Sequence, residues 1–133
     1  MPQYSTDLRD ARNDQIETTL GASPILELRT GTVPANCAAA DSGTLVASMT
    51  LPADAFAASS AGVKSMQGTW EDLSANNNGV IAHYRLKTSG GVCKMQGPAS
   101  QTGGGGEVIV NNATVVAGQP ITVTAFTIAA GGG

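Results

Sequence analysis

The stretch VIAHYRLK, residues 80–87, decides the fold of this chain, because its apolar and polar side chains alternate with a period of two. The mainly apolar face would carry Val80, Ala82, Tyr84 and Leu86. The opposite face would carry Ile81, His83, Arg85 and Lys87. Alternation of this kind is typical of a half-buried antiparallel strand. We therefore expect a strand here, with its cationic face in contact with solvent.

The same period recurs on both sides of this stretch. It is clear in PILELRT (24–30) and TLVASMTL (44–51), and shorter candidates are VKSMQGTW (63–70), GVCKMQG (91–97), EVIVN (107–111) and ATVVA (113–117). The last candidate, ITVTAFTIAA (121–130), changes phase, and a bulge near Ala125 would return Phe126 and Ile128 to the face of Ile121 and Val123. About eight strands with frequent turns predict a mainly β protein, an antiparallel β-sandwich or jelly-roll.

One segment has helical spacing instead. STDLRDARNDQIETTLG (5–21) offers Ser5 or Thr6 as the N-cap and Gly21 as the stop. Its apolar stripe is narrow, which favours a place at the domain edge or against a neighbouring subunit. We therefore divide the chain into a helical arm (1–21), a β-sandwich domain (22–130) and a flexible tail (131–133). The predicted partner-interface residues are Tyr4, Leu8, Ile16 and Leu20.

The composition argues against several classes of partner. Only 13% of the 133 residues are charged, with 10 acidic and 7 basic side chains, and the cations are scattered, so the chain lacks the basic patch that nucleic acid requires. No apolar run approaches the roughly 20 residues of a membrane-spanning helix, and the polar first residues give no export signal. Neutral surface tends to associate, which favours a homo-oligomer.

No motif predicts catalysis, a cofactor or a metal. DLSANNNG (72–79) lacks the glycine and the glutamate of a calcium loop, and TGGGGE (102–107) lacks the lysine of a phosphate loop. His83 has no nucleophile or acid at a diagnostic spacing. We therefore expect no enzyme. Cys37 and Cys93 could pair, but in a reducing cytosol two partly buried thiols are the expected state.

Four segments carry a resemblance that spans residues 4–131. YSTDLRDARNDQIETT, CAAADSGTLVASMTLP, GTWEDLSA and AGQPITVTAFTIAAG together resemble a family of small virion structural proteins encoded in tailed-bacteriophage genomes. The resemblance implies a non-enzymatic protein that is made in the host cytoplasm and resides in the virion. Its implied partner is the major capsid protein or another virion protein.

Within the virion, three roles are open. The first is a capsid decoration, or cement, protein that binds the capsid lattice in many copies and stabilises the head. The second is a structural subunit of the neck or tail. The third is a carbohydrate-binding module for host recognition, which the scarcity of aromatic residues disfavours.

Overall fold

The computed structural model describes residues 3–129 and is mainly β with one N-terminal helix, as the sequence predicts. In chain order, its elements are α1 (Thr6–Leu20), β1 (Ile25–Arg29), β2 (Leu45–Thr50), β3 (Val63–Ser65), β4 (Glu71–Asp72), β5 (Gly79–Val80), β6 (His83–Lys87), β7 (Cys93–Gln101), β8 (Val108–Val110), β9 (Thr114–Val115) and β10 (Ile121–Ala129). The predicted tail, 131–133, lies outside the described residues. No helix within 3–129 is long and apolar enough to cross a membrane.

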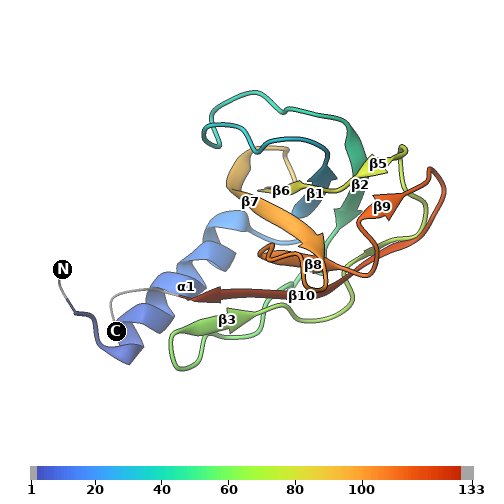
Figure 1. Cartoon of the computed structure of the whole chain (residues 1–133). Coiled ribbons are helices and arrows are strands. Elements are labelled where there is room, and N and C mark those ends of the chain that lie inside the picture. The colour runs from blue at the N-terminus through green and yellow to red at the C-terminus, as the bar shows by residue number, and fades with distance from the viewer. Residues whose placement is uncertain (1–2, 130–133) are drawn as a thin grey trace.

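The strands form one curled sheet and a small two-stranded sheet (Figure 1). The large sheet runs in the order β2-β1-β6-β7-β8-β10-β3, with β4 also paired to β10, and β5 pairs with β9. Strands β7 and β8 are parallel, so the large sheet is mixed. The Asp72 carboxylate of β4 accepts the Ser48 amide of β2 at 3.1 Å, which brings the two ends of the curl together. The predicted antiparallel sandwich or jelly-roll is therefore not confirmed.

Both outer edges of the large sheet are covered by the chain itself. On the β2 side, the carbonyl of Val46 accepts the amides of Asn76 and Asn77. On the β3 side, residues 55–60 fold back, and the Ala57 amide donates to the Ser65 carbonyl at 2.9 Å. Backbone groups that already have hydrogen-bond partners at these edges are not free to pair with a strand from another chain. The structure therefore gives no support to partner binding by extension of this sheet.

An aromatic cluster fills the inside of the curl. Trp70 is 1% exposed and packs edge-on against Phe56, with ring centroids 5.2 Å apart, and against Phe126 at 5.8 Å. Tyr84 contacts Phe126 at 5.4 Å, and its hydroxyl donates to Glu107 Oε1 at 2.8 Å. The prediction that Trp70 and Phe126 are core residues is confirmed. Only one of the five aromatic side chains, Tyr4, is left outside this core.

The predicted bulge in the last strand is confirmed. The pairing of β10 with β8 shifts register between Val123 and Ala125. As a result Ile121, Val123, Phe126 and Ile128 all face the core although their spacing changes parity.

The single strand predicted at residues 80–87 is only partly correct. This stretch is two strands, β5 and β6, with a break at residues 81–82 that reverses the parity. Val80 and Ala82 are therefore exposed, and Ile81 is buried at 3% exposure. Within β6 every residue is buried, so the cationic face predicted to be solvated is covered.

The helix has the predicted limits and is docked on the domain. The Ser5 hydroxyl caps its start by accepting the Leu8 amide, and Gly21 ends it with a φ of +76°. Figure 1 shows α1 beside β3 and the end of β10. The side chain of Asn13, 2% exposed, donates to the Gly62 carbonyl at 2.9 Å, and Lys64 binds Asp14 at 2.7 Å. Polar contacts thus attach a helix whose apolar stripe is too narrow to do so alone.

Candidate functional site

A layer of charges lies on the outer face of β1 and β6, where the sequence predicts solvent, and it buries Arg85 and Lys87. The layer consists of the cations Arg29, Arg85 and Lys87 and the carboxylates Glu27 and Asp41. Asp41 comes from the loop between β1 and β2 (residues 30–44), which folds over β6 (Figure 1). We call residues 30–44 the cover loop. The alternation along β6 correctly placed Arg85 and Lys87 on one face. It gave no sign of the cover loop, because the sequence of that loop follows no periodic pattern.

Asp41 is the centre of this layer. Its carboxylate binds Lys87 at 2.9 Å, Arg29 at 3.3 Å and the Arg85 guanidinium at a shorter distance. Hydrogen bonding to Lys87 and then to Arg85 holds the pKa of Asp41 below its usual value, although partial burial opposes the shift. Burial acts to lower the pKa of Lys87, but Asp41 and Glu27 outweigh it and raise that pKa. Both groups are therefore charged at neutral pH.

Acid is expected to loosen the cover loop. Because the folded-state pKa of Asp41 is depressed, its stabilisation is present above the ordinary value of about 4 and is lost as the pH falls through the lower folded value. Asp41 is one-third exposed, so we expect a contribution of about 1 kcal/mol. The protection factors of residues 30–44, which are exchange rates corrected for the intrinsic pH dependence of amide exchange, should fall about fivefold between about pH 5 and pH 2.

The matched variants are Asp41→Asn and Asp54→Asn. Asp41→Asn should show fast exchange in the cover loop already at pH 7, without a further acid transition there. Asp54 is an exposed carboxylate that binds only Gln67 among the described contacts, so its variant should behave like the unmodified chain. Equal exchange in both variants at pH 7 would contradict the role assigned to Asp41.

Neutral contacts fix the rest of the cover loop. His83 Nδ1 lies 2.9 Å from the Gly31 carbonyl, and Gln96 donates to the Pro34 carbonyl at 2.7 Å. Arg85 Nη2 donates to the carbonyls of Asn36 at 3.3 Å and Cys37 at 2.9 Å. Since a carbonyl acceptor requires a donor, His83 Nδ1 carries a proton. These side chains act as structural clamps for the loop.

The clamped loop places Cys37 against Cys93, the first residue of β7. Their sulfur atoms are 2.7 Å apart, although the residues are 56 positions apart in the sequence. Both side chains are partly exposed and line a hollow of about 370 Å³ together with Ala38, Ala39 and Val92. Burial, and then Cys93, raise the pKa of Cys37 to about 11, so that thiol is protonated at neutral pH. The sequence names both cysteines, but only the fold of the cover loop brings them together.

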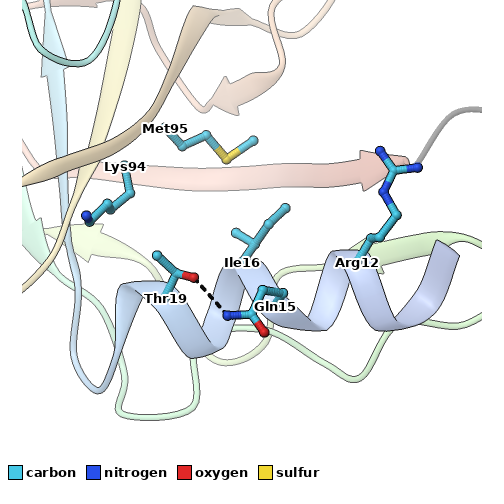
Figure 2. Close-up of a pocket in the computed structure, with 6 residues that line it drawn as sticks. All are labelled: Arg12, Gln15, Ile16, Thr19, Lys94 and Met95. Atoms are coloured by element: carbon cyan, nitrogen blue, oxygen red, sulfur yellow. Dashed lines mark hydrogen bonds between the residues drawn. The ribbon is translucent and has the colours of Figure 1, made fainter. Parts of the chain in front are cut away.

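A second hollow lies between α1 and β7. It measures about 260 Å³ and is lined by Arg12, Gln15, Ile16, Thr19, Lys94 and Met95 (Figure 2). Figure 2 shows Ile16 pointing from the helix toward Met95, while Gln15 donates to Thr19 at 3.2 Å. The walls are largely apolar and carry no paired acid and base.

The four predicted interface residues have different environments. Leu8 is 46% exposed, and Tyr4 is partly exposed with the Arg12 guanidinium over its ring at 4.9 Å. Ile16 packs against the core at its margin. Leu20 is 3% exposed and belongs to the core of this chain, so its side chain is not accessible to a partner. Only Tyr4, Leu8 and part of Ile16 remain on the surface.

The small sheet β5–β9 presents a further apolar surface. Val80 lies opposite Thr114, and Val116 is two residues farther on the same side, so the three side chains share the solvent face. Val80 is 57% exposed and Val116 is 62% exposed. Leu73, 71% exposed, lies in the segment that leads into this sheet. We call Val80, Thr114 and Val116 the small-sheet surface.

Comparisons of the chain with protein-family models, with curated proteins and with solved structures found no match.

Proposed function

We propose that this chain is a structural protein of a tailed-phage virion, and that it decorates the capsid by binding the major capsid protein in many copies. The sequence resemblance described above supports this role. Since the chain would be made in the host cytoplasm and then join the particle, it must fold alone and carry surface suited to docking.

The small-sheet surface is the observation that carries the proposal. Its exposed side chains are aliphatic or neutral, and no charged residue occurs within residues 73–80 or 112–119. Val80, Thr114 and Val116 share one face of the small sheet, and exposed apolar groups that lie together on one face are typical of an interaction site. In the view of Figure 1, β5 and β9 lie at the end of the molecule away from α1.

Neutral docking surface also suits repeated binding on a lattice. Burying apolar area contributes about 25 cal/mol per Å², and it does so without the desolvation cost of charged groups. If the protein is a homo-oligomer, several such surfaces act together, and the combined affinity exceeds that of a single contact.

Val116→Asp is expected to weaken binding to capsid shells about 30-fold or more, because a buried, unpaired carboxylate costs at least about 2 kcal/mol. Val80→Asp should act in the same direction. The matched control is Val92→Asp, since Val92 is also aliphatic and 54% exposed but lies in the turn between β6 and β7. Co-sedimentation with shells that lack this chain measures the occupancy, and melting curves check that each variant folds.

A fourth variant separates the small-sheet surface from the predicted helix interface. Leu8→Asp should leave the occupancy unchanged if docking uses β5–β9, and it should lower the occupancy if docking uses α1. Equal binding by all four variants and the unmodified chain would contradict both surfaces. Deleting residues 1–20 is a poorer test, because the deletion also removes Leu20 from the core and Asp14 from Lys64.

The copy number in purified particles tests the place in the virion. A decoration protein should be present in hundreds of copies. A ring subunit of the neck or tail, the alternative role, should be present in about six to twelve copies per layer. Quantitative mass spectrometry of the particles distinguishes the two.

A further inference from the structure

We propose that Cys37 and Cys93 form a reversible disulfide that fastens the cover loop to β7, and that small-molecule disulfides such as oxidised glutathione drive its formation. The inference concerns the chain by itself and does not depend on a role in the virion.

The first argument is distance. A disulfide requires sulfur atoms about 2.05 Å apart, and those of Cys37 and Cys93 are already within 2.7 Å as free thiols. Bond formation therefore needs only a small movement of either side chain. Cys93 pairs with Lys87 of the neighbouring strand, beside a register shift between Leu86 and Lys87, so its backbone is part of the sheet. The movement would come from the loop.

The second argument is that other contacts hold the thiols together. Arg85 donates to the carbonyl of Cys37 itself, and Asp41, four residues later, is bound by Arg85 and Lys87. Gln96 and His83 hold the loop at Pro34 and Gly31. The conformational entropy that is lost when two residues 56 positions apart are brought together has therefore already been lost in the reduced fold. Such preorganisation raises the effective concentration of one thiol at the other.

The third argument is access. Both cysteines are partly exposed and line the 370 Å³ hollow, whose other walls are Ala38, Ala39, Ala40, Gly91 and Val92 and the charged side chains of Asp41, Arg85 and Lys87. A small disulfide can therefore reach a sulfur atom from solvent. Cys37 is protonated at neutral pH, since burial raises its pKa to about 11. Cys93 lies at the start of β7 beside an exposed turn.

Because Cys37 is protonated at neutral pH, we take it as the second thiol to react. The Cys93 thiolate attacks one sulfur of the small disulfide, forming a mixed disulfide and releasing one small thiolate. Cys37 then loses its proton to solvent and attacks the Cys93 sulfur, which releases the second small thiolate. The two released thiolates take up the two protons lost by the cysteines. Two protein thiols are oxidised, and one small disulfide is reduced to two thiols.

The experiment uses the purified full chain. Reduced protein is incubated with excess oxidised glutathione and then alkylated, and its intact mass is measured by mass spectrometry. The melting temperature is measured with and without dithiothreitol. We expect a monomer lighter by two hydrogens with no alkylated cysteine, and a melting temperature about 10 °C higher that reverts on reduction. Cys37→Ser should stop at the mixed disulfide on Cys93, and Cys93→Ser should form no intramolecular bond.

Two further variants test preorganisation. Asp41→Asn should require a more oxidising glutathione ratio to close the bond, because the loop is less firmly held. Asp54→Asn, the matched control, should close at the ratio of the unmodified chain. The inference is overturned if both thiols of the unmodified chain stay open to alkylation, if the mixed disulfide persists, or if only disulfide-linked dimers form. The unmodified chain answers these questions even if a cysteine variant does not fold.

Under the proposed function, the bond would close when particles leave the reducing cytoplasm of the host. If the disulfide does not form, the proposed capsid docking by the small-sheet surface is unaffected, since β5 and β9 contain neither cysteine.

Discussion

Trp70→Ala is expected to lower the free energy of unfolding by about 3–5 kcal/mol, the largest effect of any single core substitution we foresee. Trp70 is 1% exposed and contacts both Phe56 and Phe126 inside the curled sheet. Its indole nitrogen donates to the Gln67 carbonyl at 3.2 Å, so the truncation also leaves that acceptor without its partner. Phe56 and Phe126 also pack against each other, and Phe126 packs against Tyr84, so neither ring can move into the space without losing these contacts.

Urea unfolding followed by circular dichroism measures this effect. The control is Trp70→Phe, which keeps an aromatic ring in contact with Phe56 and should cost less than half as much as the alanine variant. An alanine variant as stable as the phenylalanine variant would show that the cluster does not organise the core. Since many domains have only about 5–15 kcal/mol of stability in total, Trp70→Ala should also aggregate more readily on heating.

Gly43→Ala is expected to destabilise the fold by about 2–4 kcal/mol and to disrupt the cover loop. Gly43 has a φ of +68°, and a Cβ atom there would lie 1.9 Å from the Thr30 carbonyl oxygen. Main-chain atoms must therefore shift. Thr30 and Thr44 are joined by two hydrogen bonds that close the base of the loop, and both would be strained.

Gly31→Ala is the matched control in the same loop. Gly31 has a φ of +80°, but a Cβ atom there would meet nothing within 4 Å. Its variant should show only the cost of a left-handed backbone, about 1 kcal/mol. Thermal melts of the two variants separate the steric clash from the backbone strain, and equal melting temperatures would contradict the clash at Thr30. Gly43→Ala should also separate Cys37 from Cys93, which slower closure of the disulfide would reveal.

The parts of the fold that were predictable are those with local signals. Ser5 and Gly21 mark the helix ends because capping is a property of a few adjacent residues. The bulge at Ala125 was predictable because Phe126 and Ile128 must reach the same core as Ile121. The parallel pairing of β7 with β8 was not predictable, since it is set by the path of the chain between them rather than by the alternation of either strand.

The candidate site was less accessible from sequence for the same reason. Alternation correctly grouped Arg85 and Lys87 on one face, but it could not show that a non-periodic loop would bury them. The covering groups Asp41 and Cys37 occur in a stretch without strand or helix spacing. An acidic residue in a loop that follows a strand ending in Arg29 was the only available signal for the charge layer.

The covered edges of the large sheet have a consequence for the behaviour of the protein at high concentration. Fibril growth begins when an open strand edge templates the backbone of another molecule. Here the amides of Asn76 and Asn77 donate to the Val46 carbonyl at the β2 edge, and residues 55–60 pair with the chain at the β3 edge. The edges of the large sheet are therefore paired within the same molecule, which should slow edge-to-edge association of this chain at high concentration.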